Sequence, residues 1–237
     1  MKYLAIVLPA YNEAERLESS VEKTLAALKS TKKNFTVIIS EDGSTDGTYE
    51  IAKRLAKNKN ITLMHSGRRL GRGEALRRAF KSADAKIVGY MDVDMATDPA
   101  HIKDVIREMD NGAEIVVGNR LSSKSKVKRP IKRTLISRIY NIMARIILKS
   151  SVKDHQCGFK FFEKNFLMKI IDEIEDTYWF WDTEILVRAQ RNKAKISEIP
   201  VIWTHEKEFR SKVRLKEDTK FFFRAMLKLR KELNKKK

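Results

Sequence analysis

Two aspartates, Asp92 and Asp94, stand in the segment GYMDVDMATDP directly after an apolar run. Along an extended backbone, residues two apart point their side chains the same way, so these carboxylates form a clamp. Hard oxygen ligands suit Mg²⁺ or Mn²⁺, which commonly take one or two carboxylates together with substrate phosphate oxygens. The alternative interpretation is a solvated acidic turn in which Asp98 caps a helix beginning near Pro99, and an isolated D-x-D does not decide between the two.

A second acidic segment, EDGSTDGT at residues 41–48, also lies between an apolar run and a helical pattern. It places Asp42 at a strand end, where a nucleotide base can be read, although Asp, Gly and Ser are also what a strand-to-helix loop requires. The segment GRRLGRG at residues 67–73 can bring backbone amides and three arginines near a diphosphate. It lacks the sequence of a P-loop or of a dinucleotide-binding loop, so by itself it is a weak signal.

The remaining reactive residue types do not form a recognisable site. The histidines His65, His101, His155 and His205 show no zinc-ligand spacing. Cys157 is the only cysteine, which excludes an internal disulfide, and it has no evident partner base. The sequence therefore gives no support for zinc chemistry or covalent catalysis.

The elements that position the acidic motifs alternate between apolar runs and amphipathic segments. The expected strands are residues 3–8, 35–40, 61–65, 87–91 and 114–118, and the expected helices are residues 13–29, 45–57, 71–82 and 99–111. This alternation predicts an α/β fold with a doubly wound, mostly parallel sheet, in which ligands bind beyond the carboxyl ends of the strands. Both acidic motifs follow such ends.

A basic segment follows, with apolar residues at helical spacing from Leu135 to Ile147 and arginines interleaved among them. It predicts an amphipathic helix over residues 126–149, which either lies on anionic lipid with its apolar face down or packs on the core with a solvated basic face. Beyond it we expect a helix over 179–188, a strand over 196–203 and a basic tail over 216–237.

Composition limits the class of protein. The 237 residues are 42% hydrophobic, enough for one large domain. Fifty basic and 31 acidic residues give a formal charge of +19, which attracts phosphates, nucleic acid or anionic lipid. The apolar run at the N-terminus is short and ends at Pro9, so it is read as a strand and not as a signal peptide. The sequence contains no uninterrupted run of about 18 apolar residues, so it predicts no membrane-spanning helix.

Taken together and in order, the segments VLPAYNEAERL, EDGSTDGT, RLGRGEAL, MDVDMAT, GNR, DHQCGFKFF, FWDTEIL and RSKVR resemble the family-two inverting glycosyltransferases of the GT-A, Rossmann-like fold. The ordered set spans most of the chain and is more specific than any one motif. Within that family the chain looks most similar to the dolichyl-phosphate glucose and dolichyl-phosphate mannose synthases. Those enzymes move a hexose from UDP-glucose or GDP-mannose onto a polyprenyl phosphate at the cytosolic face of a membrane.

The resemblance implies a role for each matching position. The implied donor-binding residues are Pro9, Tyr11, Glu13, Asp42, Asp92, Val93 and Lys212, with Asp42 on the base. The implied metal ligands for Mg²⁺ or Mn²⁺ are Asp92 and Asp94. The implied acceptor-phosphate residues are Arg120, Arg133 and Ser137. The implied catalytic residues are Asp94, Arg120 and Asp182, where Asp182 orients its neighbours or, if the acceptor is a hydroxyl, acts as general base.

One departure from the pattern bears on the donor. Mannose synthases often follow the D-x-D with Leu-Gln, whereas Met95 and Ala96 stand here, which favours UDP-glucose. The resemblance implies a glycosyltransferase domain over 1–215, with donor-binding and acceptor-binding parts over 1–120 and 121–215. It also implies a cytoplasmic enzyme peripherally bound to a membrane. The alternatives are a transferase acting on a polysaccharide or soluble hydroxyl acceptor, and a nucleic-acid-binding protein, for which no known motif is present.

Overall fold

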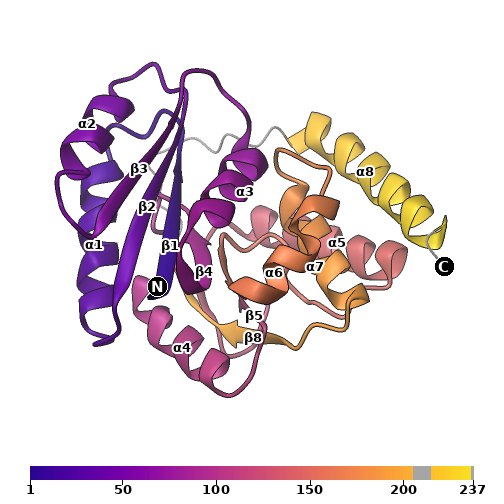
Figure 1. Cartoon of the computed structure of the whole chain (residues 1–237). Coiled ribbons are helices and arrows are strands. Elements are labelled where there is room, and N and C mark those ends of the chain that lie inside the picture. Colours follow the sequence, from indigo (N-terminus) through magenta and orange to yellow (C-terminus); the bar gives the residue numbers. More distant parts are fainter. Residues whose placement is uncertain (205–214, 236–237) are drawn as a thin grey trace.

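The computed structural model describes residues 1–204 and 215–235, and its centre is a seven-stranded sheet (Figure 1). The strand order is β3-β2-β1-β4-β7-β5-β8, and β6 and β9 form a separate two-stranded sheet. The strands are β1 (Lys2–Ala10), β2 (Phe35–Asp42), β3 (Ile61–Ser66), β4 (Ala85–Met91), β5 (Ile115–Asn119), β6 (Lys126–Lys128), β7 (Phe159–Glu163), β8 (Ile196–Pro200) and β9 (Ile202–Thr204).

The strand directions confirm a mostly parallel sheet. Strand β1 pairs in parallel with β2 and β4, and β2 pairs in parallel with β3. Strand β7 is antiparallel to both β4 and β5, so β5 and its parallel neighbour β8 run in the same direction as β4. In the seven-stranded sheet, the carboxyl ends of all strands except β7 therefore meet at one edge, where ligands bind in folds of this kind.

Strand β7 is absent from the expected strands. Its sequence FKFFE is a short apolar run, which periodicity alone cannot assign to a strand or to a buried helix. The expected strand over 196–203 is divided, because Val201 separates β8 from β9. The expected helix over 126–149 is also too long, since 126–128 form β6 and the helix begins only after Pro130, whose ring fits the start of a helix.

Helices cover both faces of the sheet. They are α1 (Leu17–Lys29), α2 (Thr48–Leu55), α3 (Arg72–Ser82), α4 (Ile102–Asp110), α5 (Ile131–Leu148), α6 (Lys164–Ile170), α7 (Trp181–Arg191) and α8 (Leu215–Lys235), with short 3₁₀ turns at Pro99–His101 and Ile171–Glu173. Along β1, Leu4 and Ile6 enter the core beneath α1, α2 and α4, whereas Ala5 and Val7 enter the core beneath α3, α6 and α7. This alternation is the period of two expected for a strand buried on both sides.

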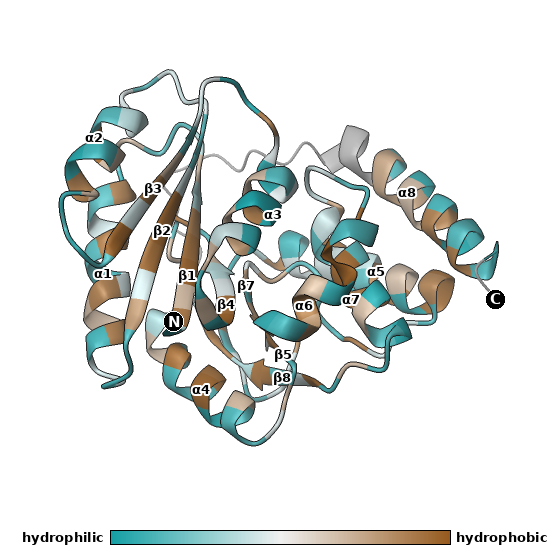
Figure 2. Cartoon of the chain, in the orientation of Figure 1, coloured by the Kyte–Doolittle hydropathy of each residue, from teal (hydrophilic) through white to brown (hydrophobic). Residues whose placement is uncertain are grey.

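A third apolar cluster joins α5, α7 and α8 at one side of the molecule, which Figure 1 shows beyond α3. Tyr140 on α5 packs edge to face on Phe222 of α8, with ring centroids 5.2 Å apart. Figure 2 shows hydrophobic strands inside the sheet and hydrophilic loops at its upper edge. Within the described parts of the chain, no helix is both long and apolar enough to cross a bilayer.

Candidate active site

The carboxyl edge of the sheet gathers most of the predicted site residues. Asp42 ends β2, Asp92 directly follows β4, and Arg120 directly follows β5. Pro9 is the next-to-last residue of β1, and Tyr11 and Glu13 lie in the loop after it. Because these strands are parallel, residues from distant parts of the sequence meet at one edge.

Asp92 and Asp94 lie close enough for each charge to act on the other. Burial and then the Asp92 charge raise the pKa of the Asp94 carboxyl to about 6. The amide of Ala96 donates to Asp94 at 3.0 Å. Asp92 packs against Gly158, where a Cβ atom would lie 1.7 Å from its Oδ2. The D-x-D is therefore a pair of partly buried, interacting carboxylates, and Asp98 also caps the turn at Pro99, as the alternative interpretation expected.

A divalent cation fits this pair. A carboxyl whose pKa is raised by burial and by a second carboxylate is stabilised in its charged form by a nearby cation. Within residues 1–204 and 215–235, no group of three or more His, Cys, Asp and Glu side chains is placed to hold a metal. Asp92 and Asp94 would therefore share the ion with substrate phosphate oxygens and water, which is the usual arrangement for Mg²⁺.

Arg72, at the start of α3, connects the D-x-D to Asp182. Its Nη2 donates to Asp92 at 2.7 Å and its Nη1 donates to Asp182 at 2.8 Å. The guanidinium lies between two aromatic rings, 4.8 Å from the centroid of Tyr90 and 5.6 Å from that of Trp179. With only 12% of its side chain exposed, Arg72 is held firmly beside the carboxylates.

Asp182, in the first turn of α7, is surrounded by donors. Besides Arg72, it accepts hydrogen bonds from the hydroxyl of Tyr90 and from Lys160 Nζ at 3.1 Å. Burial alone would raise its pKa, but the charges of Arg72 and Lys160 outweigh burial and lower it. A carboxylate with a lowered pKa and three donors is a poor proton acceptor, so this geometry suits an orienting group better than a base.

Sequence reasoning missed Lys160 and Tyr90. Lys160 is fully buried in β7, and its Nζ also donates to the carbonyl of Cys157 at 2.6 Å. A signal was present, because a lysine inside the apolar run FKFF must find partners for its charge once it is buried. Cys157 itself is buried, and burial raises the pKa of its thiol to about 12, which leaves it unreactive.

Asp42 holds the glycine-rich loop. Its two oxygens accept hydrogen bonds from the amides of Leu70 at 2.7 Å and Gly71 at 2.9 Å. The next residue, Arg72, reaches Asp92 and Asp182, so this loop links the strand ends of β2 and β4. The arrangement gives GRRLGRG a role in assembling the site, and the assignment of Asp42 to the nucleotide base stays a prediction.

The loop after β1 lies beside this assembly. The guanidinium of Arg69 stacks 3.9 Å from the ring centroid of Tyr11. The amide of Glu13 donates to Thr48 at 2.8 Å, which ties the loop to the start of α2. Val93 is buried, and its carbonyl accepts a hydrogen bond from Ser20. Val93 is therefore placed to shape the backbone of the D-x-D.

The acceptor residues implied by the resemblance differ in their burial and in their contacts. Arg120 donates from Nε and Nη2 to Asp154, each at 2.8 Å, so the pair is bidentate. Burial would raise the pKa of Asp154, but Arg120 lowers it to about 2. Ser137 is buried on α5, and Arg133 is half-buried in the first turn of that helix. Lys212 lies outside the described residues.

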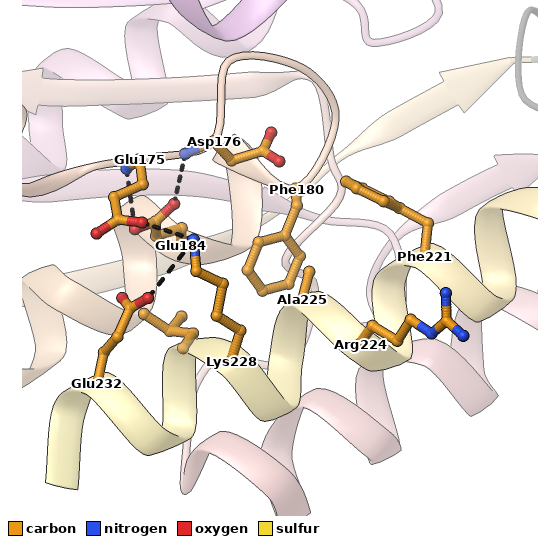
Figure 3. A pocket seen from close by; sticks show the side chains of 10 residues that line it. Glu175, Asp176, Phe180, Glu184, Phe221, Arg224, Ala225, Lys228 and Glu232 are labelled. Atoms are coloured by element: carbon orange, nitrogen blue, oxygen red, sulfur yellow. Dashed lines mark hydrogen bonds and ion pairs between the residues drawn. The ribbon is translucent and has the colours of Figure 1, made fainter.

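A pocket of about 400 Å³ lies elsewhere, between α8 and the segment leading into α7 (Figure 3). Lys228 of α8 pairs there with Glu175 at 2.8 Å and with Glu232 at 3.7 Å, and the amide of Glu175 donates to Glu184. None of the predicted site residues lines this pocket. The ion pair between Lys228 and Glu175 crosses this pocket. The pocket therefore lies at the contact between α8 and the rest of the domain.

Comparison with known proteins indicates the family to which the chain is similar. The family model described as glycosyl transferase family 2 matches residues 5–171. Glycosyltransferase AglD of Haloferax volcanii is 44% identical over 204 residues, which cover 84% of this chain and 33% of that protein. Dolichyl-phosphate beta-glucosyltransferase ALG5D of Trichomonas vaginalis is 32% identical over 216 residues, which cover 85% of this chain and 65% of that protein. The chain thus spans less than two thirds of the length of either relative.

The fold also has a counterpart among solved structures. Glucosyl-3-phosphoglycerate synthase of Mycobacterium tuberculosis, crystallised with Mn²⁺, UDP and glucosyl-3-phosphoglycerate, matches with a TM-score of 0.70. The match covers 97% of this chain and 80% of that one at 19% identity. At this identity the likeness shows the fold alone, and it confirms the expected GT-A arrangement.

Proposed function

The chain belongs to glycosyl transferase family 2, and from this premise we propose that it transfers glucose from UDP-glucose to a dolichyl or other polyprenyl phosphate. The relatives named as dolichyl-phosphate beta-glucosyltransferases support glucose as the sugar and a dolichyl phosphate as the acceptor. Met95 and Ala96 after the D-x-D support glucose over mannose, and GDP-mannose is the alternative donor.

One observation carries the proposal: the carboxylates of Asp92 and Asp94 after β4 and the guanidinium of Arg120 after β5 lie at the same carboxyl edge of the sheet. Burial lowers the pKa of Arg120, but the charge of Asp154 and, more weakly, that of Asp92 outweigh burial and raise it. Arg120 therefore lies within electrostatic reach of the D-x-D. This arrangement suits a reaction between a metal-bound donor diphosphate and an anionic acceptor.

On the donor side, Mg²⁺ or Mn²⁺ held by Asp92 and Asp94 would supply positive charge to the departing nucleotide diphosphate. Arg72 holds the Asp92 carboxylate in place through one hydrogen bond and is itself held by Asp182. Other residues of the donor site, by resemblance, are Pro9, Tyr11, Glu13, Asp42, Val93 and Lys212.

On the acceptor side, a phosphate monoester is largely ionised near neutral pH and needs positioning more than deprotonation. Arg120, fixed by Asp154, presents positive charge without a large loss of side-chain entropy. Arg133 and Ser137 would complete the acceptor site. Asp182 then orients Arg72, and no general base is required.

The surface of α5 supports action at a membrane. Its exposed side chains form an apolar stripe, whereas a helix on a soluble protein normally exposes polar residues. The stripe consists of Ile131 (87% exposed), Leu135 (58%), Ile139 (49%), Ile142 (52%) and Ile146 (70%). Exposed basic residues of the same segment are Lys132, Arg138, Arg145 and Lys149. Such a helix binds an anionic lipid surface, which would place the site beside a prenyl acceptor on the cytoplasmic leaflet.

The test is transfer of radiolabelled sugar from UDP-glucose, and separately from GDP-mannose, into an organic-extractable product with dolichyl phosphate, with and without Mg²⁺. We expect labelled lipid from UDP-glucose only when the metal is present. Donor hydrolysis without labelled lipid would instead support a polysaccharide or soluble hydroxyl acceptor.

A further inference from the structure

Two guanidinium groups lie against one indole ring at the acceptor side of the site. The Cζ atoms of Arg120 and Arg129 are each 5.7 Å from the ring centroid of Trp203. Arg120 is paired with Asp154, whereas Arg129 forms no ion pair with a carboxylate of the described residues. The cluster therefore holds two positive charges and one negative charge.

Arg129 is poorly satisfied in this position. Its Nε donates to the Thr134 hydroxyl at 3.0 Å, but its buried Nη2 has no partner within the described chain. Burial, and next the charge of Arg120, lower the pKa of Arg129 to about 10. A buried donor without an acceptor costs stability unless a ligand supplies one, and a second positive charge nearby adds to that cost.

A second unsatisfied group lies on the adjacent helix. Ser137 is 7% exposed, and its Oγ has no hydrogen-bond partner within the described ranges. Its carbonyl accepts from Asn141 Nδ2 at 2.9 Å, and Asn141 Oδ1 accepts from the amide of His155 at 2.8 Å. His155 follows Asp154, so these contacts tie Ser137 to the segment that fixes Arg120.

The start of α5 favours an anion at the same place. The residue before the helix is Pro130, and no side chain caps the first turn. The first amides of a helix and its macrodipole attract negative charge. Arg129 precedes this turn directly, and Thr134, its hydrogen-bond partner, lies within it.

We propose that Arg129, together with Arg120 and Ser137, binds a phosphate monoester, and that Arg129 supplies the charge for the second ionisation of that group. This inference rests on the proposed function and deepens it, because the reacting group of a prenyl phosphate is a phosphate monoester. Arg129 is thus a binding residue beyond the set implied by the family. Inorganic phosphate presents the same chemistry without the lipid.

The test is calorimetric titration with citronellyl phosphate, a short soluble prenyl phosphate, and separately with inorganic phosphate. Arg129→Gln should weaken binding of both probes about tenfold to hundredfold, the effect of losing a hydrogen bond to a charged group. Arg191→Gln is the matched control, since it removes the same charge from an exposed position at the end of α7, and it should bind within about twofold of wild type. Equal loss in both variants, or no binding by wild type, would overturn the proposal.

Thermal unfolding separates ligand binding from a structural role. Without ligand, Arg129→Gln should unfold at the wild-type temperature or higher, because it removes a buried unpaired donor beside Arg120. Citronellyl phosphate should raise the unfolding temperature of wild type but not of Arg129→Gln. A variant that is less stable yet still stabilised by the ligand would show that Arg129 is structural and overturn the proposal.

The two probes also distinguish the source of the phosphate. Tighter binding of citronellyl phosphate than of inorganic phosphate supports a lipid acceptor, whereas equal affinity would overturn that assignment in favour of a site for free phosphate. If wild type binds citronellyl phosphate through Arg129 but transfers no glucose to dolichyl phosphate, the proposed function fails while the assignment of Arg129 stands.

Discussion

Asp182 and Arg72 are joined by a hydrogen bond of 2.8 Å between the Oδ2 and Nη1 atoms, although 110 residues separate them in sequence. Asp182 is 5% exposed and also binds Tyr90 and Lys160. The second arm of Arg72 reaches Asp92. A residue at the start of α7 therefore controls the position of the D-x-D, without direct contact with it.

Replacing Asp182 by Asn should lower the kcat/KM of sugar transfer by roughly tenfold to hundredfold, because Arg72 and Lys160 each lose a charged partner. The pH profile of transfer should keep its shape, since an orienting carboxylate does not exchange a proton during the reaction. The matched control is Asp172→Asn, at a side chain 72% exposed on the surface. Loss of the acidic limb of the profile in Asp182→Asn would instead identify a general base.

Gly158 should be essential for metal binding. A Cβ atom there would lie 1.7 Å from Asp92 Oδ2, so Gly158→Ala must displace the carboxylate. We expect Mn²⁺ affinity, measured by calorimetry with UDP present, to fall by about tenfold to hundredfold, as for other groups that support metal ligands. Gly67→Ala is the control, because nothing lies within 4 Å of its added Cβ. Equal affinity in both variants would contradict a metal site at Asp92.

The alternation of strands and helices along the chain, apart from β7, and the position of the acidic motifs at strand ends could be predicted from the sequence. Each apolar run followed by an acidic or glycine-rich loop indicated a strand end, and parallel strands bring those ends to one edge. Asp42 and Asp92 accordingly lie where the pattern placed them, whereas Arg120 was implied only by the resemblance. Predicting the fold class required only the periodicity of apolar residues, which is a local property of the chain.

The contacts within the site could not be predicted in the same way, because they join residues far apart in sequence. Asp92 packs against Gly158, and Lys160 donates a hydrogen bond to Asp182. Both contacts exist only because β7 lies between β4 and β5 in the sheet. The sequence around β7 does not reveal that insertion. In the sequence Arg129 is only one of many basic residues, and its unsatisfied donor is apparent only once it is buried beside Trp203.

Membrane binding should depend on the apolar stripe of α5. Ile139→Glu places a charge where an isoleucine side chain, 49% exposed, would enter the lipid, and removes the gain from its burial. Co-sedimentation with vesicles containing anionic lipid should weaken by about tenfold or more. Lys23→Gln, on the exposed surface of α1, changes net charge equally and is the control. Equal weakening in both variants would show that net charge alone drives binding.

The stability of the fold should fall in mild acid because of His155. Its Nδ1 lies 2.8 Å from Asn141 Oδ1, which can only accept, so Nδ1 carries a proton; its Nε2 lies 2.8 Å from Ser150 Oγ, which can donate to a neutral ring. Burial lowers the pKa of His155 from 6.5 to about 4. Between these values the unfolded chain binds a proton that the folded chain does not, so stability is lost as the pH falls from 6.5 to about 4.

The full contribution of His155 is about 3 kcal/mol, of which about 2 kcal/mol should be lost between pH 6.5 and pH 5. Urea unfolding of wild type and His155→Gln at pH 7 and pH 5 measures it. Glutamine offers a donor and an acceptor but does not titrate, so the variant should be less stable at pH 7 and lose less stability at pH 5. If His155→Gln loses as much stability as wild type, the neutral buried ring is not the cause.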